Sequence, residues 1–131
     1  MSDVTDKAPK ARVHPVGVGM PHWLLLNSFG TMAYRAFGTY PLLVGSALSN
    51  RDPRDIDVRL VLSDSQFDQL FGMGSLNQAG TGWADTCIVW SAYATTMVAK
   101  AVDFQIQSDT AAILYKGQLR LPLGTAPWTE A

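Results

Sequence analysis

The sequence is poor in the residues that form disulfides, thiolate metal sites and histidine-centred catalytic groups. It contains one cysteine, Cys87, and two histidines, His14 and His22. A single cysteine excludes an internal disulfide and a cysteine-based zinc site. The two histidines lie near the N-terminus and no acidic residue adjoins either one. This arrangement does not favour a Ser-His-Asp triad, in which a carboxylate orients the histidine.

The sequence also lacks a charge excess and a long apolar run. The formal net charge is −1 at pH 7, so no global field favours nucleic acid or an anionic membrane, and any basic surface would have to be local. The opening residues, MSDVTDKAPKAR, are polar and lack the apolar region of a secretory signal. The apolar clusters are too short to span a bilayer. We therefore expect a soluble cytoplasmic protein that makes no membrane contact.

What the sequence does contain is enough apolar material for one globular core. At 131 residues, 47% of them apolar, the chain has the length of a single domain. We expect a flexible arm over residues 1–20, a folded domain over 21–124 and a loose tail over 125–131.

Apolar periodicity predicts an alternation of helices and strands. The first helix begins at Pro21 and ends at Gly38, with Leu25, Phe29, Met32 and Ala36 on its apolar face. Short apolar or alternating runs predict strands at 40–45, 55–63, 101–108 and, as an edge strand, 118–124. Further helices are expected at 64–74, capped by Ser63 or Asp64, at 83–100 and, capped by Asp109, at 109–117. In the 83–100 helix, the expected apolar face carries Cys87, Trp90, Ala94 and Met97. This order predicts an α/β (α+β) fold, with a small mixed sheet flanked by helices.

Three aspartates fall on polar faces of the expected strands. Asp55 and Asp57 share one face of the second strand because side chains alternate, and Arg59 continues that face. Asp103 occupies the polar face of the third strand, between Val102 and Phe104. If these strands are neighbours, three carboxylates converge, and like charges repel unless a positive group lies between them. Carboxylates without histidine or thiolate indicate Mg²⁺ or Mn²⁺.

Gly45 and Ser46 follow the first expected strand and offer a possible phosphate site. Glycine lets a phosphate approach the main chain, and backbone N–H groups and a hydroxyl can donate to it. The pattern thus favours a divalent cation with a triphosphate on its other side.

These motifs resemble the polymerase-β-like nucleotidyltransferase superfamily, in its minimal single-domain form. The resemblance rests on LLVGSALSNRDPRDIDVRLVL followed by VDFQI, and covers about residues 21–107. It implies that Asp55 and Asp57 hold both metal ions, that Asp103 holds the metal that activates the acceptor, and that Gly45 and Ser46 bind the triphosphate. The implied reaction moves a nucleotidyl group from an NTP such as ATP to a hydroxyl of RNA, a protein or a small molecule.

The loop between the two motifs departs from that family. Many minimal members have an arginine soon after Gly-Ser and a serine before Asp-x-Asp, where this chain has Ala47-Leu48 and Arg54. Arg51 or Arg54 is the expected substitute for the missing cation.

Other interpretations remain open from the sequence. Asp-x-Asp is common on solvated strand faces, and Gly-Ser is common in turns. The glycine-rich stretch GMGSLNQAGTG is expected to be a surface loop, with a substrate lid as the alternative. The alternative to an enzyme is a non-catalytic, antitoxin-like binding or regulatory protein of the same fold, acting with a toxin or antitoxin partner or as a homo-oligomer.

Overall fold

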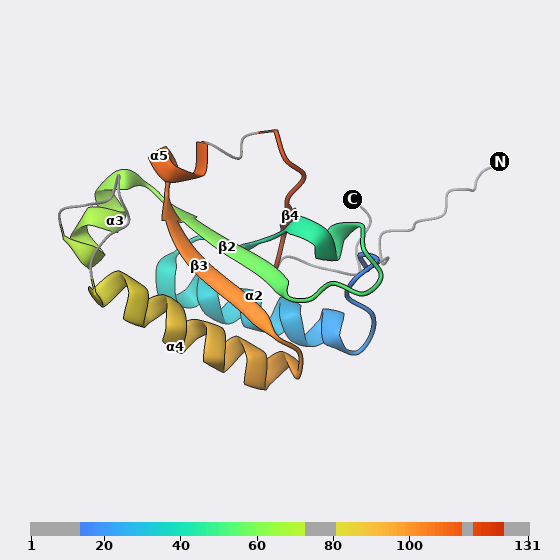
Figure 1. The fold of residues 1–131 in the computed structure, drawn as a ribbon. Helices are drawn as coiled ribbons and strands as arrows, with labels where there is room; N and C mark the ends of the chain where they lie inside the picture. Colours follow the sequence, from blue (N-terminus) through green and yellow to red (C-terminus); the bar gives the residue numbers. More distant parts are fainter. Residues whose placement is uncertain (1–13, 73–80, 114–116, 125–131) are drawn as a thin grey trace.

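The chain folds around a mixed four-stranded sheet with helices on one side (Figure 1). The computed structural model describes residues 14–72, 81–113 and 117–124. The strands are β1 (Leu42–Val44), β2 (Ile56–Leu62), β3 (Val102–Ser108) and β4 (Leu121–Pro122), in the spatial order β3-β2-β1-β4. β1 is antiparallel to both β2 and β4, whereas β2 and β3 are parallel. The expected α/β (α+β) class, with a small mixed sheet flanked by helices, is confirmed.

Helices α2 (His22–Phe37) and α4 (Thr81–Val98) cover one face of this sheet. In Figure 1, α2 crosses behind β2 and β3, and α4 runs beside β3. Phe29 of α2 meets Phe104 of β3 edge to face, with ring centroids 5.5 Å apart, and meets Trp90 of α4 at 5.8 Å. These three elements therefore share one aromatic core.

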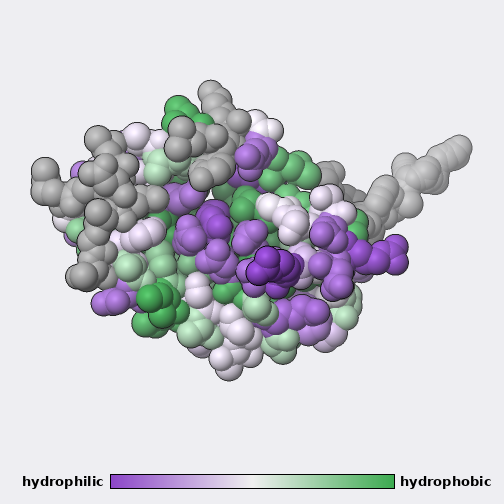
Figure 2. All heavy atoms as spheres, viewed as in Figure 1, coloured by the Kyte–Doolittle hydropathy of each residue, from purple (hydrophilic) through white to green (hydrophobic). Residues whose placement is uncertain are grey.

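Strict alternation gives β2 one buried and one open face. Its burial alternates residue by residue, with Ile56, Val58, Leu60 and Leu62 buried under the helices. The intervening Asp57, Arg59 and Val61 are only partly buried. Viewed from the open side, hydrophilic side chains gather over β2 and β3 (Figure 2). The open face of the sheet is thus where polar chemistry can occur.

The buried stripe of α2 differs from the expected one. Phe29 is buried, but Leu25 and Met32 are only partly buried and Ala36 is exposed. The buried positions are Trp23, Leu26, Asn27, Phe29, Gly30 and Ala33. The buried face of α2 is rotated from the predicted one because α2 packs against both α4 and the sheet. Its predicted end at Gly38 is confirmed, since Gly38 has φ 84° and its N–H donates to the Tyr34 carbonyl.

The short helices begin at serine caps. Ser63 accepts a hydrogen bond from the Gln66 N–H at the start of α3 (Asp64–Phe71). Ser108 does the same for Ala111 at the start of α5 (Asp109–Ala112). The predicted Asp109 cap was wrong by one residue, because Ser108 has the extended backbone that a cap requires and Asp109 is already helical.

Part of the expected N-terminal arm packs on the domain. Val18 is fully buried, and the Gly17 N–H donates to the Ala47 carbonyl of η1 (Gly45–Leu48), a 3-10 helix, at 2.8 Å. Residues 1–13, the glycine-rich residues 73–80 and the expected tail 125–131 lie outside the described residues. In the described parts of the chain, no helix has the length and apolar character that crossing a membrane requires.

Helix α4 closes the outer edge of β3 with its own side chains. The Ser91 hydroxyl accepts from the Phe104 N–H at 2.8 Å and donates to the Phe104 carbonyl at 3.0 Å. Thr95, one turn later, makes the same pair of hydrogen bonds to Val102 at 3.0 and 3.4 Å. An open edge strand invites pairing with another chain, and these hydroxyls occupy its donors and acceptors.

Two more side chains of α4, one and two turns before Ser91, also bond the backbone of β3. The Cys87 sulfur accepts from the Ile106 N–H at 3.4 Å, and the Trp83 indole N–H donates to the Ile106 carbonyl at 2.7 Å. The spacing of four residues matches one turn of helix, while alternate residues of β3 turn their backbone groups outward. Burial of Cys87 raises the pKa of its thiol, which keeps it a thiol in this role.

Candidate functional site

Asp57 and Asp103 lie side by side on the open sheet face. They are register partners on the parallel strands β2 and β3, so their side chains project from the same face. The Asp57 side chain is 29% exposed and that of Asp103 is 41% exposed. The structure therefore brings together two of the three acids that the sequence singled out.

Gly45 adjoins the Asp57 carboxylate from the other neighbouring strand. Val44 at the end of β1 is the register partner of Asp57, and Gly45 follows with φ 78°. A Cβ added at Gly45 would lie 2.6 Å from the Asp57 Oδ2 atom, closer than any non-bonded contact permits. The backbone conformation at this position thus favours glycine, and a Cβ here would also push the Asp57 carboxylate aside.

Arg59 supplies the positive charge between the two carboxylates. Its Nη2 atom lies 3.5 Å from Asp103 Oδ2 and 3.9 Å from Asp57 Oδ1. Its Nη1 atom donates to the Asp103 carbonyl at 2.9 Å and to the Val58 carbonyl at 3.0 Å. The sequence predicts a metal ion among the acids; in this structure the positive group beside Asp57 and Asp103 is the Arg59 side chain of β2.

The pKa of Asp57 is raised above its ordinary value. Burial is the largest cause, because a partly desolvated carboxylate is less stable when charged. Arg59 acts in the opposite direction and lowers the pKa, whereas the nearby charges of Asp103 and Asp55 raise it. A positive group close to Asp57 therefore stabilises its charged form.

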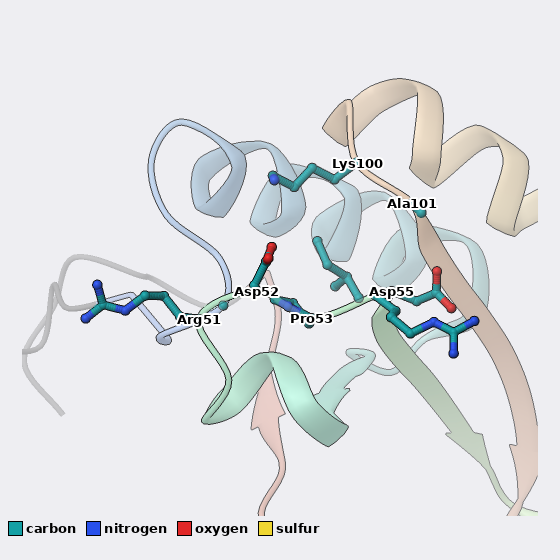
Figure 3. Close-up of a pocket in the computed structure, with 9 residues that line it drawn as sticks. Arg51, Asp52, Pro53, Asp55, Lys100 and Ala101 are labelled. Atoms are coloured by element: carbon teal, nitrogen blue, oxygen red, sulfur yellow. The ribbon is translucent and has the colours of Figure 1, made fainter.

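Asp55 and the two loop arginines lie around a separate hollow. Asp55 is exposed and precedes β2. The hollow has a volume of about 270 Å³ and is lined in part by Arg51, Asp52, Arg54, Asp55 and Lys100. Figure 3 shows Asp52 and Lys100 directed into the same space, with Arg51 pointing away. We call this the loop hollow, and it combines three cationic side chains with two carboxylates.

Ser46 follows Gly45 in the exposed first turn of η1. Its carbonyl accepts hydrogen bonds from the Ser49 and Asn50 N–H groups at 3.1 and 2.6 Å. These bonds fix the backbone of the turn that follows β1. Ser46 itself is exposed at the surface.

A second cavity, of about 210 Å³, opens beside Asp57 and Arg59 on the same sheet face. We call it the strand-face cavity, and its lining includes Gly45, Asp57, Arg59, Gln105, Gln107 and Gln118. Gln105 also donates weakly to Asp103 Oδ2, at 3.5 Å. Carboxamides both donate and accept, so the cavity can hydrogen-bond a polar ligand next to the carboxylates.

The donor chemistry of this site fits a hard divalent cation. Carboxylate oxygens are the ligands that Mg²⁺ and Mn²⁺ take, with water and phosphate filling the remaining positions. Among residues 14–72, 81–113 and 117–124, however, no three His, Cys, Asp or Glu side chains are grouped closely enough to hold a metal ion. Asp57 and Asp103 are the pair that a cation could bridge, and the Arg59 guanidinium now contacts both.

Sequence reasoning missed the glutamines and the role of Arg59. The signal for Arg59 was present, because alternation places it on the same strand face as Asp57. Gln105 and Gln107 follow Asp103 on its own face in the same way, but Gln118 comes from the segment before β4 and has no local signal. Comparison with family models, curated proteins and solved structures found no match for this chain.

Proposed function

We propose that this chain is a metal-dependent nucleotidyltransferase that moves a nucleotidyl group from an NTP to an acceptor hydroxyl. One observation carries the proposal. Gly45, directly after β1, adjoins the Asp57 carboxylate, and Asp57 is the register partner of Asp103 on the neighbouring strand.

Within the proposed site, the carboxylates and the loop side chains would have different roles. Asp57 and Asp103 would bind Mg²⁺ or Mn²⁺, whereas Asp55 lines the separate loop hollow. When bound, such ions stabilise the charge on the attacking and leaving oxygens of a phosphoryl-type displacement. The raised pKa of Asp57 favours its binding to a positive ligand, since a cation offsets the cost of burying its charge.

The phosphate groups would lie on the side of Gly45 and the loop. Gly45 lets the Asp57 carboxylate approach the main chain closely, and Ser46 is exposed one residue later. Arg54 and Lys100, which line the loop hollow, can neutralise phosphate charge, whereas the Arg51 side chain points away from it (Figure 3). Arg54 and Lys100 would replace the loop arginine that the resembled family often has.

The test is transfer of label from each of the four α-labelled NTPs with Mg²⁺ and a cell extract, followed by separation of RNA, protein and small molecules. Wild-type protein should label one of these fractions. Asp57→Asn and Asp103→Asn should lower the rate by about a hundredfold or more, because charge stabilisation dominates such reactions. Asp68→Asn, an exposed carboxylate of α3, should match wild type.

Two results would contradict the proposal. One is a folded Asp57→Asn variant with the wild-type rate. The other is a wild-type protein that labels none of the fractions above the level of Asp57→Asn with any of the NTPs.

A second candidate is a non-catalytic binding or regulatory protein of the same fold. Arg59 favours it, because its ion pairs let both acids exist in the folded chain without a metal. Such a protein would associate with a toxin or antitoxin partner or with itself. Light scattering on the purified chain would detect self-association, and absence of transfer together with a stable complex would favour this candidate.

A further inference from the structure

Arg59 is held in place by four polar contacts and by burial. Two of its contacts are to the carboxylates of Asp57 and Asp103, and two are hydrogen bonds to the backbone carbonyls of Asp103 and Val58. Its side chain is only 19% exposed. An arginine that is mostly buried and multiply bonded is a defined part of the site, in contrast to a mobile surface charge.

A guanidinium and a divalent cation compete for the same oxygens. A cation that bridges Asp57 and Asp103 would bring a second positive charge to within a few ångströms of the guanidinium. Arginine cannot relieve this repulsion by losing its proton, because it stays charged under all ordinary conditions. The side chain must therefore move before the two carboxylates can bind a cation together.

The strand-face cavity provides space into which the Arg59 side chain can move. Arg59 already lines it, and Gln105, Gln107 and Gln118 line the rest with carboxamide groups. Their oxygens accept hydrogen bonds from a guanidinium. The cavity volume of about 210 Å³ leaves room for the side chain and for part of an anionic ligand that would attract it.

We propose that Arg59 is a built-in counter-ion that a divalent cation must displace, so that metal and an anionic phosphate ligand bind cooperatively. The metal alone would bind weakly, since it competes with the guanidinium. A nucleoside triphosphate would draw the guanidinium to its phosphates and leave both carboxylates to the cation. This inference rests on the proposed nucleotide site, but its first test uses the metal alone.

The test is Mn²⁺ titration of the full chain, with free Mn²⁺ followed by electron paramagnetic resonance. Arg59→Gln should bind Mn²⁺ about tenfold or more tightly than wild type, within the usual range of coupling between sites. Arg59→Lys should lie between them, because a lysine keeps the charge but not the fork that bonds two groups. Adding Asp103→Asn to Arg59→Gln should remove the gain.

A calorimetric titration with the preformed Mn·ATP complex tests the cooperativity. Wild type should bind Mn·ATP much more tightly than Mn²⁺, and this ratio should shrink about tenfold in Arg59→Gln. Circular dichroism checks the fold, and Arg59→Lys serves if Arg59→Gln unfolds.

The proposal is overturned if a folded Arg59 variant binds Mn²⁺ no more tightly than wild type, or if Asp103→Asn leaves the gain intact. An unchanged ratio of the two affinities would overturn the cooperativity. Failure of nucleotidyl transfer with the Mn²⁺ differences present would reject the proposed function and leave the role of Arg59 standing.

Discussion

Gly45 lies so close to the Asp57 carboxylate that a Cβ at position 45 would have no space unless this carboxylate moved. An added Cβ at Gly45 would lie 2.6 Å from Asp57 Oδ2, and Gly45 also has φ 78°. Two independent physical causes, contact and backbone conformation, therefore favour glycine at this position. A matched comparison can separate them, because Gly38 has a similar φ of 84° and nothing within 4 Å of its added Cβ.

Gly45→Ala should destabilise the protein more than Gly38→Ala. The left-handed backbone alone costs about 1–2 kcal/mol for a residue with a Cβ, and this is the whole cost expected at Gly38. At Gly45 the contact with Asp57 should add a further but smaller cost, because the added Cβ would force the partly exposed Asp57 carboxylate to turn away. Urea unfolding of both variants measures the difference. Adding Asp57→Ala to Gly45→Ala should recover the contact contribution, and equal losses at Gly38 and Gly45 would contradict the close fit.

Asp57→Asn should not lower the free energy of unfolding at pH 7. The folded state raises the pKa of Asp57 above 3.8, so its proton binds more tightly in the folded than in the unfolded chain. Its titration therefore favours folding below the unfolded pKa and loses this effect as pH rises through the folded pKa. At neutral pH the ionised carboxylate opposes folding, and an amide removes that opposition while Asp103 still pairs with Arg59.

Thermal unfolding from pH 3 to 8 checks this expectation. The midpoint of Asp57→Asn should equal or exceed that of wild type at pH 7, and its advantage should shrink as the pH falls toward 3.8. The same change at the exposed Asp68 provides the control for loss of one charge. A midpoint for Asp57→Asn several degrees below wild type at pH 7 would show that the Asp57 charge stabilises the fold.

The strand pattern was predictable because its signals are local. Alternation in VDFQIQ and DIDVRLVL fixes which side chains face the core, so the placement of Asp57 and Asp103 on polar faces followed directly. Neither strand alone indicates that β2 and β3 are parallel neighbours with Asp57 and Asp103 in register. Register depends on how α4 connects them and packs on them, which is a property of the whole fold.

Arg59 and the polar side chains of α4 that bond β3 show why other features of the site and the fold could not be predicted from the sequence. The sequence places Arg59 on the acidic face, but whether it turns to Asp57, Asp103 or solvent depends on the neighbouring strand. On α4, the periodicity of apolar residues indicates Cys87 and Trp90. Ser91 and Thr95 matter because they face backbone groups of β3, and hydropathy carries no signal for that.

Ser91→Ala should destabilise the protein by about 1–3 kcal/mol. The change leaves both the N–H and the carbonyl of Phe104 without the hydroxyl that now bonds them, and unsatisfied backbone groups that are partly buried cost this much. Thr96→Ala, on an exposed position of the same helix, should be neutral or slightly stabilising because alanine favours helices. Hydrogen exchange at the Phe104 amide should accelerate only in Ser91→Ala. Unchanged exchange there would show that the hydroxyl does not protect the edge.

Asp64 joins the beginnings of two helices. Its carboxylate, at the first residue of α3, accepts hydrogen bonds from the N–H and the hydroxyl of Thr110 in α5. These hydrogen bonds lower the pKa of Asp64 below 3.8, because they favour the charged form. A lowered folded pKa means that Asp64 stabilises the fold above the unfolded pKa, and that this contribution disappears as pH falls through the folded value.

Asp64→Asn should therefore lower the thermal midpoint at pH 7 by a few degrees, as expected for a small loss in a domain of this size. The deficit should narrow as the pH falls below 3.8, where the wild-type carboxylate also takes up a proton. Thr110→Val removes the hydroxyl and keeps the N–H, so it should produce a smaller deficit with the same pH dependence. Asp68→Asn on the same helix controls for the charge of α3. If Asp64→Asn and Asp68→Asn have equal midpoints at every pH, the link between α3 and α5 does not stabilise the fold.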